Sequence, residues 1–167
     1  MPLIESRIDD GVALVELNDP KRRNALTPQL VTAYVARIDE LEADESVFAI
    51  VVTGRGRAFC AGADLSELGD AREAGLRGIY EMFTRTERCS LPTVAAVNGP
   101  AVGAGFNLAL ACDVRFAGPH ARFDSRFLSL GIHPGGGHTW LTDRVVGPST
   151  TSAMVLFGEV LYAAASH

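Results

Sequence analysis

The sequence has no run of basic residues and only three cysteines. Its 167 residues carry 15 Lys and Arg against 20 Asp and Glu, a net charge of −5. A mildly acidic chain without a basic run argues against nucleic acid and anionic membrane as main partners, although a local basic loop can still hold a phosphate. Cys60, Cys89 and Cys112 are odd in number and lack metal-ligand spacing. The first residues, MPLIESRIDDG, contain no hydrophobic signal segment, so we expect a reduced, cytoplasmic protein.

Charge is also missing from the stretch between Arg88 and Asp113. Its length suggests a membrane span, but prolines, asparagines and glycines interrupt it, and we expect none. The residue pattern instead predicts a buried strand over 93–97, a turn at 98–100 and a buried helix that opens at 103–105 and runs to residue 112.

The opening of this helix is made of small residues, Gly103-Ala104-Gly105. Small residues let another molecule approach the backbone, and the first N–H groups of a helix have no internal partner. This favours a site for an anion or for an oxygen that becomes one. A dinucleotide fingerprint is incomplete, because Leu108 stands at its third glycine position. A core helix with small residues for packing stays open as the simpler interpretation.

The other patterns indicate one globular α/β domain. With 47% hydrophobic residues the chain can bury a real core. Residues 3–9 and 12–17 flank Asp10-Gly11 as in a β-hairpin, and Thr27-Pro28 starts an amphipathic helix that reaches Leu41. Residues 48–53 are typical of a strand covered on both faces, and we expect a further helix around 149–157.

Two loops carry residues with possible chemistry. Residues 18–26 include Lys21, Arg22 and Arg23, which form either a solvated loop or a clamp for a phosphorylated ligand. The loop GRGRAFCAGADL follows the strand expected at 48–53, and we expect a short helix to start at Asp64-Leu65. It is either a plain connection or, with the helix at 103–105, a second set of amides converging on one oxygen.

The motifs AFCAGADL at 58–65, PTVAAVNGPAVGAGFNLALACD at 92–113 and GIHPGGG at 131–137 resemble the enoyl-CoA hydratase/isomerase family, the crotonase superfamily. The resemblance extends from Val12 to about Gly158. It implies a spiral of ββα units in a single domain, 1–167 with a core of about 3–158, whose C-terminal helical region is largely missing. It also implies an acyl-CoA thioester as ligand, no cofactor beyond the coenzyme A of the substrate, no metal, and a homo-oligomer, a trimer or hexamer.

The same resemblance implies the site residues. Two backbone amides, of Ala61 and Ala104, would polarise the thioester carbonyl and stabilise an enolate. The implied substrate-binding residues are Arg22, Arg23, Ala25, Ala61, Gly62, Ala63, Asp64, Leu65, Ala104 and Phe127.

The sequence departs from the hydratase pattern at the acid and base. Relatives that hydrate an enoyl thioester have glutamates at the places of Asn107 and Phe127, and isomerase-like relatives have an aspartate at the place of Gly135. Asparagine can hold a water but cannot take its proton, and phenylalanine can do neither. Asp124 could act as a base if its side chain faces the pocket.

His138 is a further candidate for catalysis. His133 and His138 flank a glycine-rich turn, where an imidazole that caps a loop or is partly buried is the simpler interpretation. These two histidines are not expected to bind a metal ion, because the sequence shows no third ligand for it.

We therefore expect an acyl-CoA thioester enzyme with weak or no simple hydratase activity. The alternative is a non-catalytic acyl-CoA-binding or subunit-like relative, and a nicotinamide oxidoreductase is a distant third. The chain ends early relative to the family, either as a fragment or as a shortened protein, and the apolar residues at 160–162 near its end would favour association.

Overall fold

The computed structural model describes residues 1–64 and 72–163, and it contains two β-sheets. The larger sheet has the order β1-β2-β3-β4-β6, formed by β1 (Ile4–Asp9), β2 (Val12–Leu17), β3 (Ala49–Gly54), β4 (Thr93–Val97) and β6 (Val114–Ala117). Only the β1–β2 pair is antiparallel, and the other neighbours are parallel. The smaller sheet has the order β5-β7-β8, formed by β5 (Pro100–Val102), β7 (Arg122–Asp124) and β8 (Val160–Tyr162).

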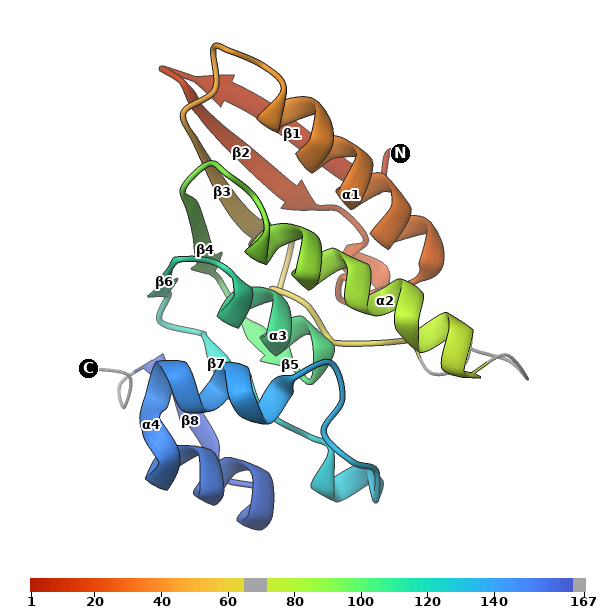
Figure 1. The fold of residues 1–167 in the computed structure, drawn as a ribbon, viewed down its shortest axis with the longest axis vertical. Helices are drawn as coiled ribbons and strands as arrows, with labels where there is room; N and C mark the ends of the chain where they lie inside the picture. The colour runs from red at the N-terminus through yellow and green to blue at the C-terminus, as the bar shows by residue number, and fades with distance from the viewer. Residues whose placement is uncertain (65–71, 164–167) are drawn as a thin grey trace.

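The helices cover one face of the larger sheet and then the smaller one (Figure 1). They are the α-helices α1 (Pro28–Glu42), α2 (Arg72–Glu87), α3 (Ala104–Ala111) and α4 (His138–Phe157), and the short 3₁₀ helices η1 (Pro20–Arg22) and η2 (Leu128–Leu130). The core lies between α1, α2, α3 and the sheet, where Ala13, Val15 and Leu17 of β2 are fully buried. The predicted mixed α/β class is therefore confirmed.

Most predicted elements are present. The hairpin pairs Ile4 with Leu17 and Asp9 with Val12, and α1 starts after Thr27, whose hydroxyl accepts a hydrogen bond from the Leu30 N–H at 3.2 Å. The helix expected at 149–157 is only the second half of α4. Gly147 inside it has non-helical backbone angles and is followed by Pro148, so the sequence pattern breaks there although the helix resumes. The strands β5, β6, β7 and β8, the helix α2 and the first half of α4 were not predicted.

The loops after β3 and β4 lie side by side because these strands are parallel neighbours and leave the sheet at the same edge. Cys60, in the loop after β3, pairs with Ala101 of β5. The Cys60 N–H donates to the Pro100 carbonyl at 3.1 Å, and the Val102 N–H donates to the Cys60 carbonyl at 3.0 Å. This pairing brings residues 60–63 next to the start of α3. Within the described chain, no helix has the length and apolarity needed to cross a bilayer.

Candidate active site

The start of α3 presents backbone donors. All eight residues of α3 are buried, and the N–H groups of Phe106 and Asn107 both donate to the Gly103 carbonyl at 3.0 Å. Among the backbone hydrogen bonds of the described residues, none uses the N–H of Ala104 or Gly105. Ala104 is 9% exposed, so its N–H lies at the margin between core and solvent. The expectation of a free amide at this helix start agrees with this geometry.

The second loop directs a different amide than expected. The Ala61 N–H donates to the Arg23 carbonyl at 3.0 Å, so it is already satisfied. Leu26 pairs with the peptides around Ala63: its N–H donates to the Gly62 carbonyl at 2.8 Å and its carbonyl accepts from the Asp64 N–H at 3.1 Å.

Peptide groups of extended chain alternate in direction, and the Ala63 N–H therefore points away from Leu26. No backbone acceptor for it occurs in the described parts of the chain. The structure thus corrects the expected donor of this loop from Ala61 to Ala63.

The two loops approach so closely that glycine is required at the contact. A Cβ at Gly62, where φ is +91°, would lie 2.6 Å from the Val102 carbonyl oxygen and 3.7 Å from the Ala104 nitrogen. A Cβ at Gly105 would lie 2.4 Å from the Cys60 carbonyl oxygen. Larger residues at these two places would push the loop and the helix start apart.

A cavity of about 370 Å³ opens in front of this contact. Its lining consists of residues 61–63, 79–80, 102–104, 107, 125–127, 130, 132–133 and 135. The lining is mostly apolar, and none of the described residues that form it is Asp or Glu. An apolar cavity of this size with a few convergent polar groups is typical of a small-molecule site. Tyr80 of α2, whose hydroxyl approaches Gly135, belongs to this lining and had no signal in the sequence.

Asn107 and His138 are joined by a hydrogen bond, which sequence analysis did not anticipate. Asn107 is 1% exposed, donates from Nδ2 to the Gly135 carbonyl at 3.2 Å, and has its Oδ1 2.6 Å from Nδ1 of His138. The other imidazole nitrogen, Nε2, lies 2.8 Å from Oγ of Ser125. His138 is fully buried, and this burial lowers its pKa to about 4. The expected partly buried imidazole is therefore a fully buried, neutral one.

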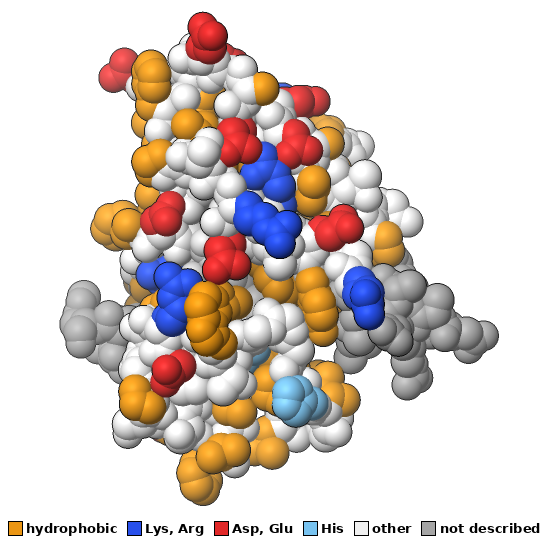
Figure 2. All heavy atoms as spheres, in the orientation of Figure 1, with side chains coloured by type: hydrophobic (Ala, Val, Ile, Leu, Met, Phe, Trp, Pro, Cys, Tyr) orange, Lys and Arg blue, Asp and Glu red, His pale blue; other side chains and the backbone are white. Residues whose placement is uncertain are grey.

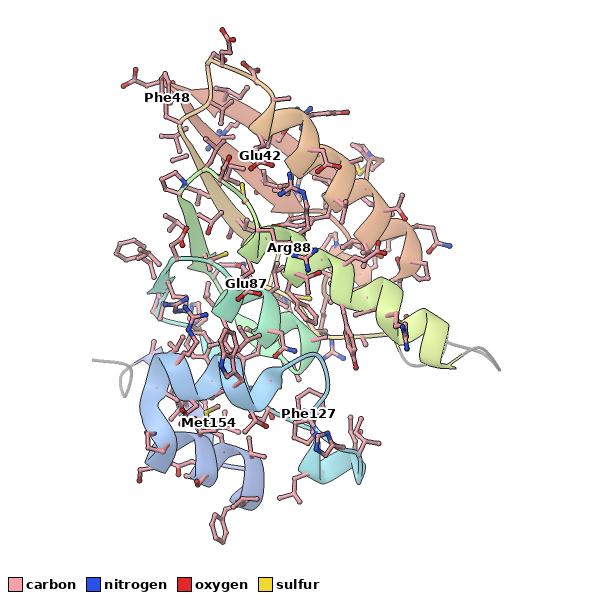
Figure 3. The ribbon with its side chains drawn as sticks, in the orientation of Figure 1. Glu42, Phe48, Glu87, Arg88, Phe127 and Met154 are labelled. Carbon is pink, nitrogen blue, oxygen red and sulfur yellow. The ribbon has the colours of Figure 1, made fainter. Side chains whose placement is uncertain are left out.

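Phe127 is the residue directly before η2 and lines the cavity (Figure 3). Its ring centroid is 4.9 Å from that of His138. The Phe127 ring thus covers the imidazole and adds apolar surface at the place where the family resemblance implies a glutamate. His133 is exposed and also lines the cavity, whereas His138 does not.

Asp124 does not meet the condition set for it as a base. Its carboxylate accepts hydrogen bonds from Nε of Arg126 at 3.1 Å and from the terminal nitrogen of that guanidinium at 2.5 Å, and Arg122 lies 3.5 Å away. It is absent from the cavity lining, although residues 125–127 are present. The carboxylate is therefore outside the cavity lining and is paired with Arg122 and with Arg126, which does line the cavity.

The basic loop lies beside the site rather than in it. Asn24 is fully buried and its Nδ2 donates to the carbonyls of Ala58, at 2.9 Å, and Phe59, at 3.2 Å, which fixes the loop against the segment 58–61. Arg22 and Arg23 are exposed, and Nε of Arg22 bonds Asp19 at 2.7 Å. Neither arginine nor the half-buried Ala25 lines the cavity. Leu65 lies outside the described residues.

The chain belongs to the enoyl-CoA hydratase/isomerase family, whose profile matches residues 7–166. It is 56% identical over 155 residues to the "Probable enoyl-CoA hydratase EchA14" of Mycobacterium tuberculosis, covering 90% of this chain and 60% of that protein. It is 42% identical over 163 residues to the 2,3-dehydroadipyl-CoA hydratase of Escherichia coli, covering 96% of this chain and 64% of that protein. The chain therefore spans about three fifths of the length of these relatives.

Solved structures confirm the crotonase fold. An enoyl-CoA hydratase of Bacillus anthracis superposes with a TM-score of 0.92 at 28% identity, covering 97% of this chain and 65% of that one. An enoyl-CoA hydratase of Polaromonas sp. JS666 gives a TM-score of 0.88 at 30% identity, covering 96% and 65%.

Proposed function

We propose that this chain binds an acyl-CoA thioester and stabilises its enolate with the N–H groups of Ala63 and Ala104. The observation that carries the proposal is that two backbone donors, each without a backbone acceptor among the described residues, stand on closely packed segments and line one apolar cavity. When a thioester loses an α-proton or is attacked at its β-carbon, negative charge grows on the carbonyl oxygen. Donors fixed beforehand around that oxygen stabilise the transition state more than the ground state.

The coenzyme A part would lie against the basic loop. Loop 18–26 is held next to the donor segment by the Arg23–Ala61 hydrogen bond and the Leu26–Ala63 pairing. Arg22 and Arg23 are exposed at the outer side of that loop, where phosphates can reach them. No cofactor other than this coenzyme A is part of the proposal.

Simple hydration should be slow. Asn107 uses its amide oxygen and nitrogen on His138 and Gly135, and Phe127 offers no proton. Hydration needs a base for the water and an acid for the α-carbon, and each such group typically contributes about 10²–10⁴-fold. The absence of a carboxylate from the described cavity lining favours the second candidate, a non-catalytic acyl-CoA-binding protein.

The test is a crotonyl-CoA hydration assay, in which turnover is monitored as loss of the absorbance of the conjugated thioester. Binding is measured separately by thermal shift. We expect binding without robust turnover by the wild type. Failure to bind would refute the proposal, and fast turnover would show that another acid–base pair operates.

Restoring the missing groups separates the two candidates further. Asn107→Glu alone should recover little hydration, whereas the double variant Asn107→Glu/Phe127→Glu should recover more than the product of the single effects, because the two groups act as a unit. Unfolding curves must accompany each variant, since a buried carboxylate at Phe127 is costly. If the hydration rate of the double variant is only the product of the two single effects, a paired acid and base at these positions is contradicted.

Assembly belongs to the same proposal. Leu156 and Phe157 at the end of α4 are 63% and 81% exposed, and hydrophobic side chains gather at that end of the molecule (Figure 2). We propose that copies of the chain associate as a homo-oligomer and cover this surface. Light scattering coupled to size exclusion would test it, and a monomer across all concentrations would contradict it.

A further inference from the structure

A series of three hydrogen-bonded side chains beside the cavity is not needed for enolate stabilisation. The Asn107 amide donates from Nδ2 to the Gly135 carbonyl, so its oxygen faces the imidazole of His138 and accepts from it. Nδ1 of His138 therefore carries the ring proton. A neutral imidazole then has a lone pair on Nε2, and the hydroxyl of Ser125, 2.8 Å away, donates its proton to that lone pair. The result is a hydroxyl, a base and a group that orients the base.

The series lies next to the proposed donors. The Gly103 N–H donates to the Asp124 carbonyl at 2.9 Å, which continues the parallel pairing of β5 with β7 by one residue. Ser125 therefore lies beside Gly103, the residue that precedes Ala104. Ser125 and Asn107 line the same cavity as Ala63 and Ala104. His138 is sealed behind them, since it is fully buried and absent from that lining. A thioester carbonyl held by the two amides would thus lie in the cavity that Ser125 also lines.

Simple packing does not require this arrangement. The imidazole is surrounded by Phe106 and Phe127, with ring centroids at 5.5 and 4.9 Å, where an apolar side chain would avoid the cost of burying polar nitrogens. Both nitrogens are instead satisfied, and both partners, Asn107 and Ser125, are residues of the cavity lining. A hydroxyl bonded to a base that is held by a third group is the arrangement of an activated nucleophile.

We propose that Ser125, His138 and Asn107 form a nucleophilic triad that hydrolyses acyl thioesters. Oγ of Ser125 attacks the carbonyl carbon while its proton passes to Nε2 of His138. The C–S bond then breaks, and the leaving sulfur takes that proton to give free thiol and an acyl-serine ester. Water attacks the ester, its proton passes through His138 to Oγ of Ser125, and a carboxylic acid leaves. Asn107 holds the imidazole without touching the substrate, as a positioning residue.

Deacylation should be the slower half of this reaction. Asn107 is neutral and does not balance the positive charge that His138 acquires, and a serine alkoxide leaves less easily than a thiolate. The acyl-serine should therefore accumulate, which makes it the direct observable. This activity rests on the proposed function only through its thioester substrate, so the two can be tested apart.

The experiment uses the whole 167-residue chain with two probes, acetyl-CoA and p-nitrophenyl acetate. Thermal shift measures acetyl-CoA binding, intact mass and peptide mapping locate an acetyl adduct, and released thiol or nitrophenolate gives the rate. Ser125→Ala removes the nucleophile and His138→Gln removes the base. Ser129→Ala is the matched control, because Ser129 is exposed, bonds the Arg126 carbonyl and lies outside the cavity lining. Circular dichroism checks folding. If Ser125→Ala does not fold, Ser125→Cys gives a second readout, because its adduct would be a thioester that neutral hydroxylamine cleaves, whereas the ester on Ser125 of the wild type resists that treatment.

We expect an adduct on Ser125 in the wild type and in Ser129→Ala, none at that position in Ser125→Ala, and labelling at least about tenfold slower in His138→Gln. Binding of acetyl-CoA without labelling by either probe overturns the triad and leaves the proposed function standing. Labelling of Ser125 by p-nitrophenyl acetate without acetyl-CoA binding supports Ser125 as an activated nucleophile but overturns the thioester as its substrate, and with it the proposed function. If the protein shows neither binding nor labelling, the triad and the proposed function are both overturned.

Discussion

Lowering the pH should destabilise this protein through one buried side chain, His138. Burial lowers its pKa from 6.5 to about 4, because the charged imidazole would lose its hydration. The folded state therefore binds the proton less readily than the unfolded state. The contribution is complete above the unfolded pKa of 6.5 and is lost as the pH falls from there to about 4.

The size of the effect follows from the two pKa values. A difference of 6.5 − 4, or 2.5 units, corresponds to about 3 kcal/mol of unfolding free energy when both states are fully protonated. Between pH 7.5 and pH 5 the loss should be about 2 kcal/mol, since the folded imidazole is then still mostly neutral. Glu42, whose pKa is lowered to about 2 by hydrogen bonds from Ser90, affects stability only below this window.

Urea unfolding at half-unit steps from pH 7.5 to pH 5 measures this loss directly. The His138→Gln variant is the matched control, because glutamine can keep polar contacts but does not titrate, and the wild-type curve minus the variant curve isolates the imidazole. An NMR titration of the His138 ring carbon gives its folded pKa independently. Parallel wild-type and variant curves, or an NMR pKa near 6.5, would refute the argument that desolvation dominates at this site.

Three further outcomes are expected. Replacing both Arg22 and Arg23 by Ala should weaken acyl-CoA binding at low salt, with a loss that shrinks at high salt, and an unchanged dissociation constant by calorimetry would contradict the phosphate contact. Gly62→Ala should destabilise the fold by about 1–3 kcal/mol and weaken thioester binding, because its Cβ would meet the Val102 carbonyl oxygen at 2.6 Å with φ at +91°. A wild-type free energy of unfolding and a wild-type thioester affinity in this variant would count against the close contact. Thr27→Ala should lower the free energy of unfolding by about 0.5–2 kcal/mol by removing the cap of α1 while acyl-CoA affinity is retained, and a lost affinity would show that the cap also shapes the site.

Sequence patterns predicted the elements whose signals are local. The Asp10-Gly11 turn, the apolar spacing after Thr27-Pro28 and the β-branched run at 93–97 each favour one backbone structure regardless of what lies nearby. The strand β5 gave no such signal, because its three residues are held by pairing with Cys60 and β7. The first half of α4 starts at a glycine-rich turn that indicates a loop when read alone.

The candidate site divides in the same way. The sequence by itself determined that small residues stand at two helix or loop starts, that glutamate is missing at Asn107 and Phe127, and that the chain resembles one family. Only the tertiary structure decided which amide of the second loop is available, because the Arg23 carbonyl that occupies the Ala61 N–H is distant in the chain. It also decided that Ser125, Asn107 and His138 meet. Hydrogen bonds between residues 13 and 31 positions apart depend on how β7, α3 and α4 pack, and no local pattern encodes that packing.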